Sequence, residues 1–278
     1  MLRLLQIEFH KFKYNRSSKV ITAVYFILIT FIALIASIEF NFGGVHFRVA
    51  DQGIFNFPFI WHFNTWIAAI LKLFLAIVIV SMMANEYSNR TLKQNLIDGL
   101  SKKEFILSKF LMVCVFALIS TLFIFIVSLI LGLIFSDYNE FSIIFSDLEY
   151  IFAYFIKLLG FFSFCLFLGI WVRKSAFALG FLLIWSIVEG ILYALMKWQF
   201  FKDTNIADTV AQFFPLTAMS NLIIEPFSRL GAVQSAANQL GEGFTKSYDV
   251  QITTVLIVLA WTFLFIYWSY LIVKKRDL

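Results

Sequence analysis

The sequence predicts an all-α polytopic membrane protein with six transmembrane helices, built as a single six-span membrane domain over residues 1–278. Of its 278 residues, 61% are hydrophobic and only 14% are charged, whereas soluble domains carry roughly a quarter charged residues. The mean hydropathy is +0.88. Apolar runs recur along the chain, and a helix needs roughly 20 apolar residues to cross a bilayer. Composition and run length together exclude an ordinary soluble domain.

Six apolar runs have the required length and are separated by polar segments. They are Val20–Ile38, Trp61–Met83, Phe105–Phe135, Tyr150–Val172, Ala176–Lys197 and Ile252–Val273. The third run is the longest, so we expect its helix to extend beyond the bilayer on one side. A bias towards Phe, Ile, Asn and Lys is typical of A+T-rich bacterial genomes and agrees with a location in a bacterial inner membrane.

The basic residues predict which side of the membrane each loop occupies. Most of the 22 Lys and Arg residues lie before the first run, after the second, between the fourth and fifth, and after the sixth. They are Arg3, Lys11, Lys13, Arg16, Lys19, Arg90, Lys93, Lys102, Lys103, Lys109, Arg173, Lys174, Lys274, Lys275 and Arg276. Because basic loops remain in the cytoplasm, both termini are predicted to be cytoplasmic. We expect no removable signal peptide, since no short apolar core with a cleavage site follows the N-terminus.

Residues 1–18 are predicted to form an amphipathic helix on the cytoplasmic membrane surface. Leu2, Leu5, Phe9 and Phe12 recur at helical spacing, and polar or basic residues fill most of the other face. This pattern is typical of helices that lie in the membrane interface. The alternative is a basic anchor that only enforces the topology.

Residues 84–104 form an organised polar segment between the second and third runs. Leu92, Leu96, Ile97 and Leu100 are predicted to line one side of a short helix. Gly99 suits the end of that helix, because glycine adopts a positive φ without a Cβ clash. Ser101 followed by Glu104 predicts a capping box that starts the next helix. This organisation favours a docking element, and the alternative is a surface helix that covers apolar ends of the bundle.

The same segment resembles the cytoplasmic connection of type-2 ABC exporter permeases. The resemblance rests on Glu86, on the run Arg90-Thr91-Leu92-Lys93, on Leu96 and Gly99, and on the Ser-Lys-Lys turn before Lys109. The six-span plan, a surface helix with Glu8 and Lys11, and a large outer loop before the last span extend it over nearly the whole chain as architecture. The chain departs from the family where it has Arg90 in place of a frequent Gly and lacks a Pro near the turn.

The resemblance implies a coupling helix that contacts a separate ABC ATPase subunit, with ATP and magnesium bound by that partner. The implied coupling residues are Glu86, Arg90, Thr91, Leu92, Lys93, Leu96, Ile97 and Gly99. It also implies pairing with a second permease copy or a homologous permease. No G-x-x-x-x-G-K-[ST] motif occurs in the sequence. We therefore expect this chain to bind no cofactor and not to be an enzyme on its own.

Three charged residues, Lys72, Lys157 and Glu189, lie within the predicted spans. Such residues usually face a partner or a wet cavity, because a lone charge is costly inside a bilayer. Lys157 and Glu189 lie at matching depth on consecutive spans, which predicts an ion pair with either a structural or a functional role. Lys72 has no depth-matched acid of its own. It is the candidate for a substrate-path or subunit-interface residue, the alternative being that it snorkels or binds backbone carbonyls.

Residues 198–250 form the longest segment outside the spans and are predicted to be extracytoplasmic. Part of it is apolar yet too short to cross, which favours re-entrant or interfacial helices over a plain solvated loop. In type-2 exporter permeases a similar hairpin closes the outer end of the pathway. The resemblance therefore implies outer-gate roles for Pro215, Asn221 and Pro226.

The expected function is export of an amphipathic, lipid-like, drug or peptide substrate, in contact with membrane lipid and without a nucleic-acid partner. A membrane scaffold that docks a cytoplasmic partner without transport is the alternative, and an intramembrane enzyme is disfavoured because no catalytic set converges at one depth. Neither a catalytic nor a metal site is expected, apart from a weak cation site in the acidic loop. The acidic residues of that loop are Asp137, Glu140, Asp147 and Glu149. Cys114 and Cys165 are expected to be buried small hydrophobes.

Overall fold

The computed structural model describes residues 2–42, 45–48, 53–202, 205–230, 233–234 and 247–276, most of them helical. In chain order the helices are α1 (Leu2–Tyr14), α2 (Arg16–Ser37), α3 (Phe59–Ser88), α4 (Thr91–Ile97), α5 (Lys102–Phe135), α6 (Phe141–Ile144), α7 (Glu149–Val172), α8 (Ser175–Leu195), the π-helix η2 (Met196–Phe200), α9 (Ile206–Ala211), α10 (Pro215–Asn221), the 3₁₀-helix η3 (Phe227–Arg229) and α12 (Ile252–Lys275).

Five helices of the described chain are long and apolar enough to cross a membrane. Their ranges are Phe59–Ser88, Lys102–Phe135, Phe141–Val172, Ser175–Phe200 and Ile252–Lys275, and they coincide with the second to sixth predicted runs. The chain therefore has the character of a multi-pass membrane protein. The first predicted run forms most of α2, which has 22 residues. Helix α5 has 34 residues, a rise of about 51 Å against a hydrocarbon core of about 30 Å.

The described chain is helical, as predicted, apart from a short β-hairpin that follows α2. Strands β1 (Glu39–Phe42) and β2 (Val45–Arg48) pair antiparallel, with Glu39 opposite Arg48 and Phe42 opposite Val45. Apolar and polar residues alternate in both strands, and a Gly-Gly pair stands between them. This alternation around a glycine pair is a hairpin signal that the prediction of long apolar runs did not include.

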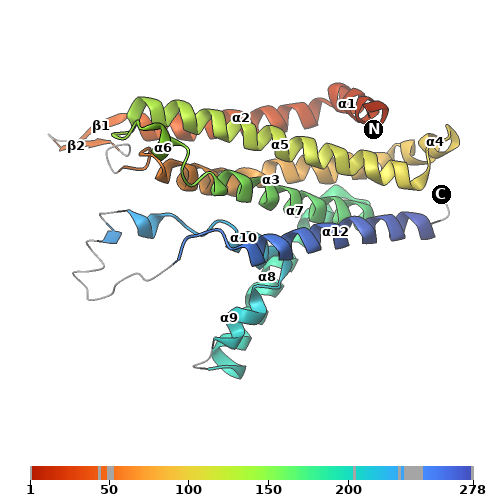
Figure 1. The fold of residues 1–278 in the computed structure, drawn as a ribbon. Coiled ribbons are helices and arrows are strands. Elements are labelled where there is room, and N and C mark those ends of the chain that lie inside the picture. The colour runs from red at the N-terminus through yellow and green to blue at the C-terminus, as the bar shows by residue number, and fades with distance from the viewer. Residues whose placement is uncertain are drawn as a thin grey trace.

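Helix α7 forms the centre of a bundle in which α2, α3, α5, α7 and α12 run side by side (Figure 1). In the most apolar window of the α6–α7 span, 78% of the residues are buried, compared with 11% for the span that contains α8. Helix α8 leaves the bundle at an angle and carries α9 at its far end (Figure 1). The described part of the chain therefore leaves most of the α8 surface uncovered.

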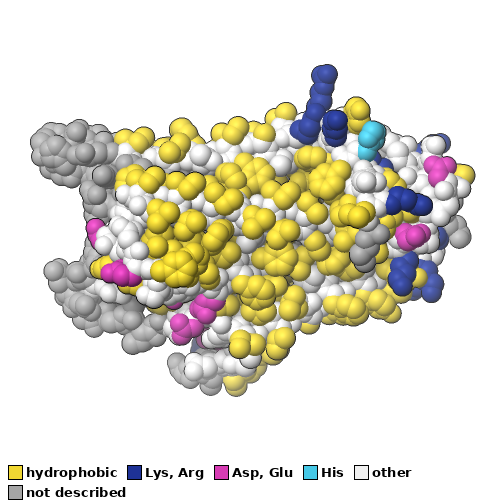
Figure 2. Space-filling view, turned by 45° about the horizontal axis from the view of Figure 1, so that its top comes forward, with side chains coloured by type: hydrophobic (Ala, Val, Ile, Leu, Met, Phe, Trp, Pro, Cys, Tyr) yellow, Lys and Arg dark blue, Asp and Glu magenta, His cyan; other side chains and the backbone are white. Residues whose placement is uncertain are grey.

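The two ends of the bundle differ in composition. Helices α1 and α4 and the C-terminus lie at one end, and the β-hairpin and α6 lie at the other (Figure 1). Figure 2 shows hydrophobic side chains along the bundle, with Lys and Arg gathered towards the end that carries α1 and α4. A row of half-exposed apolar residues follows α5, at 45% to 53% exposure: Ile119, Leu122, Ile126, Ile130 and Leu133. Such a row suits contact with lipid.

The C-terminus is fastened to the end of the bundle near α4. The Arg276 guanidinium donates to the carbonyls of Ile170 at 2.8 Å and Trp171 at 3.2 Å, near the end of α7. Cationic groups stabilise helix C-termini because the last carbonyls carry partial negative charge. Lys102, at the start of α5, donates in turn to the carbonyl of Arg276 at 2.8 Å. This end is thereby held together by α5, α7 and α12.

Gly160 allows α7 and α12 to approach closely, and we predict that Gly160→Ala destabilises the bundle. A Cβ at this position would lie 2.7 Å from Val258 Cγ1 and 3.2 Å from Met219 Cε. Valine is short and stiff at χ1, so the helices must separate at an expected cost of about 1–3 kcal/mol. Thermal unfolding in detergent measures the effect.

Gly180→Ala is the matched control for Gly160→Ala. A Cβ at Gly180 would meet nothing within 4 Å, and alanine is the better helix former by about 1 kcal/mol. The melting temperature should therefore stay the same or rise slightly for Gly180→Ala. Equal melting temperatures for the two variants would contradict the close approach of α7 and α12.

Candidate functional site

The local structure of the 84–104 segment agrees with the prediction from its sequence. Arg90 takes a left-handed conformation with φ 56° between α3 and α4, and Gly99 takes φ 94° after α4. Ser101 caps α5 by accepting from the Glu104 N–H at 3.2 Å, and Glu104 accepts from the Ser101 N–H at 2.9 Å. The predicted short helix, sharp stop and capping box are all confirmed.

The faces of α4 differ in part from the prediction. Leu92 and Leu100 are buried at 2% and 9% exposure, and Leu96 packs partly buried against the core. Ile97 was predicted on the same side, and this prediction is wrong because its side chain is 75% exposed. Helix α4 makes fewer than two full turns, and it packs through Leu92 and Leu96, which turns the following residue outward.

The outward surface of this segment contains several of the predicted coupling residues. Arg90, Lys93, Ile97 and Gly99 are exposed, whereas Thr91 is partly buried. An exposed isoleucine with Lys93 one turn before it and Asp98 directly after it is a surface that a partner protein can bind. We call the exposed residues Arg90, Lys93, Ile97 and Gly99 the docking face.

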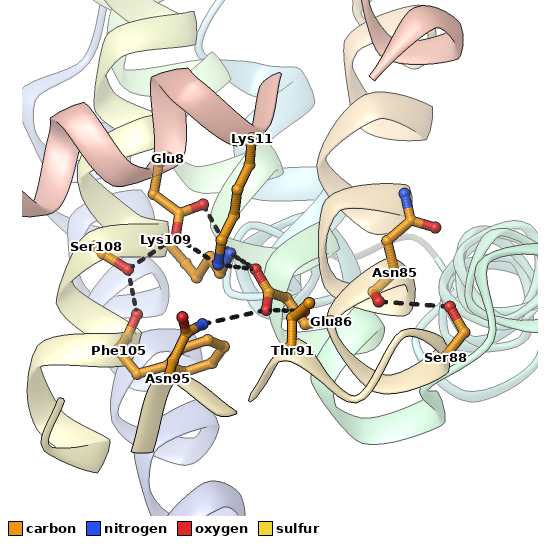
Figure 3. Close-up of polar contacts among 10 residues, drawn as sticks. All are labelled: Glu8, Lys11, Asn85, Glu86, Ser88, Thr91, Asn95, Phe105, Ser108 and Lys109. Atoms are coloured by element: carbon orange, nitrogen blue, oxygen red, sulfur yellow. Dashed lines mark hydrogen bonds and ion pairs between the residues drawn. The ribbon is translucent and has the colours of Figure 1, made fainter. Parts of the chain in front are cut away.

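Glu86 lies on the opposite, inner side of the segment, at 3% exposure (Figure 3). Its Oε1 accepts from Lys11 Nζ of α1 at 2.7 Å and pairs with Lys109 Nζ of α5. Its Oε2 accepts from Thr91 Oγ1 at 2.6 Å, with Asn95 Nδ2 3.5 Å away. Glu86 therefore connects α3 to α1, α4 and α5 and is a structural anchor behind the docking face.

Glu8 completes this arrangement from α1. Its Oε2 lies 2.7 Å from Lys109 Nζ, and Lys11 Nζ lies 3.8 Å from its Oε1. Ser108 Oγ is 3.3 Å from Glu8 Oε1. We call Glu8, Lys11, Glu86 and Lys109 the four-charge cluster; its formal charges cancel. Lys109 has no exposed surface and Glu8 is 3% exposed, so the pairing offsets a large desolvation cost.

An open hollow of about 350 Å³ adjoins the cluster between the α1–α2 junction and α3. Its polar lining includes Asn15, Ser18, Asn85 and Asn89, and its floor is formed by apolar residues such as Met82. Thr91, the first residue of α4, also lines the hollow, so the hollow adjoins the segment that carries the docking face.

The intramembrane charges Lys157 and Glu189 bind opposite ends of α10. Glu189 Oε1 accepts from Trp185 Nε1 at 2.7 Å and from the Leu216 N–H at 3.1 Å. Its Oε2 accepts from the N–H and the hydroxyl of Thr217 at 2.9 and 3.0 Å. A carboxylate at a helix N-terminus is favourable because the first N–H groups lack helical partners.

Lys157 lies at the other end of α10 and donates to the carbonyls of Ser220 at 3.3 Å and Ile223 at 3.5 Å. The predicted Lys157–Glu189 ion pair is wrong, because each side chain is engaged by a different end of α10. Helix α10 is therefore held between α7 and α8 by an acid at its start and a base at its end.

The predicted outer-gate residues mark the ends of this segment. Pro215 is the first residue of α10 and is buried, Asn221 is its last residue and is exposed, and Pro226 is buried just before η3. Lys72 lies elsewhere, on α3, with its ammonium 4.5 Å from the centroid of the Phe161 ring on α7. Among the described residues, no carboxylate or hydrogen-bond acceptor contacts it.

The acidic loop forms no metal site in the described part of the chain. No group of three or more His, Cys, Asp or Glu side chains with metal-ligand geometry occurs there, and Asp137 instead accepts from Asn56 at 3.1 Å. Both cysteines are free, Cys165 being buried and Cys114 partly buried.

A family model described as "Protein of unknown function (DUF2705)" matches residues 51–278 of the chain. The chain belongs to this family. No curated protein matches the sequence.

The DUF2705 match includes the docking face, α10 and two members of the four-charge cluster, Glu86 and Lys109. Glu8 and Lys11 precede the matched range. Sequence reasoning did not identify Glu8 as a functional residue. The available signal was an acid in a basic amphipathic helix, placed three residues before Lys11 and followed by no other acid before α2 ends.

Proposed function

We propose that this DUF2705 chain is the membrane-spanning permease subunit of an ATP-driven ABC exporter in a bacterial inner membrane. In this proposal α2 is a sixth span, both termini are cytoplasmic, and two permease copies pair. ATP and magnesium bind to a separate ATPase subunit, and the substrate is amphipathic. Helix α2 supports a sixth span, because its 22 residues rise about 33 Å against a hydrocarbon core of about 30 Å.

The observation that carries the proposal is the placement of α4. It connects two candidate spans, α3 and α5, and exposes Ile97 while Glu86 fastens its inner side to three other helices. A force applied to the docking face would therefore move α1, α3 and α5 together. A flexible linker between two spans would require neither the buried cluster nor the capping box.

The distribution of charge supports the proposed orientation. The end of the bundle that carries α1, α4 and the C-terminus is the end towards which Lys and Arg gather (Figure 2), and basic segments stay in the cytoplasm. Helix α10 then lies towards the outer side. Its attachment to both α7 and α8 suits an outer gate that opens when α8 moves.

We predict that Ile97→Asp combined with Lys93→Glu prevents an ABC ATPase from co-purifying with the tagged chain from native membranes. The double variant inverts charge and removes an apolar contact on an exposed surface, so the fold should be retained. Wild type should capture an ATPase, recognised by its peptides and by ATP hydrolysis in the eluate. The amount of ATPase captured by the variant should be at least about tenfold lower, since a desolvated hot-spot residue contributes about 2 kcal/mol or more to binding.

Phe141→Asp is the matched control, because Phe141 is 78% exposed and begins α6, which lies at the opposite end of the bundle (Figure 1). This variant should retain the ATPase. If wild type captures no ATPase, the exporter proposal fails and the membrane scaffold becomes the better hypothesis. If both variants capture it equally, the ATPase docks elsewhere than on α4.

A further inference from the structure

Lys72 is a cation in the interior of a candidate span. It lies 13 residues after Phe59 and 16 before Ser88, the ends of α3, distances of about 20 and 24 Å along the helix. A lysine so far from both ends cannot place its ammonium in the aqueous interface. Its ammonium instead lies over the face of Phe161, at 4.5 Å from the ring centroid.

The charged groups near Lys72 leave it without a counter-ion. Lys157 is one turn before Phe161 on the same face of α7 and is itself a cation, bound by the carbonyls of Ser220 and Ile223 at the end of α10. Glu189 is the acid at comparable depth, and each of its oxygens already accepts two hydrogen bonds. The described residues in this layer therefore hold two cations and one fully engaged anion.

The described spans of a second copy would not supply the missing anion at this depth either. Among the described residues of the candidate spans, the other acids are near the helix ends, as Glu86, Glu104 and Glu149 are. A cation–π contact alone contributes about 0.5–2 kcal/mol, less than the cost of about 2.5–3.5 kcal/mol for a lysine at the centre of a span. An unpaired ammonium at this depth therefore favours an external anion.

Beyond the Phe161 ring that Lys72 contacts, aromatic side chains of α7 and α8 suit the apolar part of such a ligand. Phe164, one turn along α7 from Phe161, lies 5.7 Å from Trp185 of α8, measured between ring centroids. Helix α8 then leaves the bundle (Figure 1), and Val188 beyond Trp185 is 45% exposed. An acyl chain could therefore lie along α8 with its head beside α3.

We propose that Lys72 binds the anionic group of an acidic amphiphile, a carboxylate or phosphate on an acyl chain, at mid-depth between α3, α7 and α8. The inference rests on the proposed function, because it names the chemical class of the exported substrate. The ammonium of Lys72 supplies the charge-assisted hydrogen bond, and the surrounding aromatic and aliphatic side chains bind the acyl chain.

The test is competition binding to the purified full chain in phosphatidylcholine nanodiscs, with radiolabelled palmitate as the probe. The competitors are hexadecyl phosphate, methyl palmitate and hexadecyltrimethylammonium, which carry an anionic, a neutral and a cationic head on similar chains. Against wild type, hexadecyl phosphate should compete about tenfold better than methyl palmitate, the margin of one charge-assisted hydrogen bond.

Three variants test the residue itself. Lys72→Met should abolish the preference for the anion, Lys72→Arg should keep most of it, and Lys72→Glu should shift it to the cation. Lys197→Met is the control, since Lys197 is an exposed lysine near the end of another candidate span, paired with Asp208, and the preference should survive there.

The proposal is overturned if wild type does not bind palmitate, if it shows no preference for the anion, or if Lys72→Met keeps that preference. This assay contains no ATPase, so its result is independent of the α4 docking experiment. If the chain captures an ATPase but shows no preference for the anionic competitor, the exporter proposal is retained and only the inference about Lys72 is rejected.

Discussion

Replacing Lys109 by methionine is expected to lower the free energy of unfolding by about 3–5 kcal/mol. Lys109 has no exposed surface and is the shared cation of Glu8 and Glu86. Methionine has nearly the same length and leaves no large cavity, so the loss is electrostatic. Two buried carboxylates would remain, with only the partly exposed Lys11 to neutralise them. Unfolding in mixed detergent micelles, followed by circular dichroism, measures the effect.

Two comparisons make the Lys109 result specific to the four-charge cluster. Lys109→Met combined with Glu86→Gln should be more stable than Lys109→Met alone, because one of the uncompensated charges is removed. Lys103→Met, on the same helix but exposed, should change the stability by less than about 0.5 kcal/mol. If Lys109→Met is no less stable than Lys103→Met, the cluster does not hold α1, α3 and α5 together.

Replacing Glu189 by leucine is expected to release α10 from α8. The substitution leaves the N–H groups of Leu216 and Thr217 and the indole N–H of Trp185 without their acceptor. A fully buried donor left unsatisfied costs about 1–3 kcal/mol, and these three are partly buried, so each should cost less. The attachment of α10 should therefore be lost before the bundle unfolds. Glu189→Gln keeps an acceptor oxygen and should have a smaller effect.

A cysteine at Met219, which is 1% exposed in α10, reports this release. In a background without Cys114 and Cys165, a membrane-impermeant maleimide should label Met219→Cys slowly, and much faster when Glu189→Leu is added. If Met219→Cys is labelled at the same rate with and without Glu189→Leu, Glu189 does not hold α10.

The sequence predicted those features that depend on local chemistry. Ser101 and Glu104 predicted the start of α5 because a capping box needs only its own four residues. Gly99 predicted the end of α4 because few other residues adopt a positive φ. The apolar runs predicted the candidate spans because run length alone decides whether a helix can cross a bilayer.

The features that sequence missed depend on elements far apart in the chain. The positions of Lys157 and Glu189 along their helices predicted that both lie at the same depth in the membrane. Depth alone does not show which groups surround a side chain, so it did not reveal that both residues bind α10. Glu86 belonged to a recognised motif, yet its burial depends on α1, which lies 75 residues earlier at Lys11. Ile97 has the polarity of a core residue, and only the packing of α4 decides that it faces outward.

The four-charge cluster also orders the events of biosynthesis. Glu8 and Lys109 are 101 positions apart, and at about 5–20 residues per second the ribosome needs about 5–20 seconds between them. Throughout that interval the four-charge cluster is incomplete, because Lys109, the partner of both Glu8 and Glu86, has not been translated. Helix α1 is therefore translated well before it can settle at its end of the bundle. Its docking onto α3 and α5 reports that both helices have been inserted in the correct register.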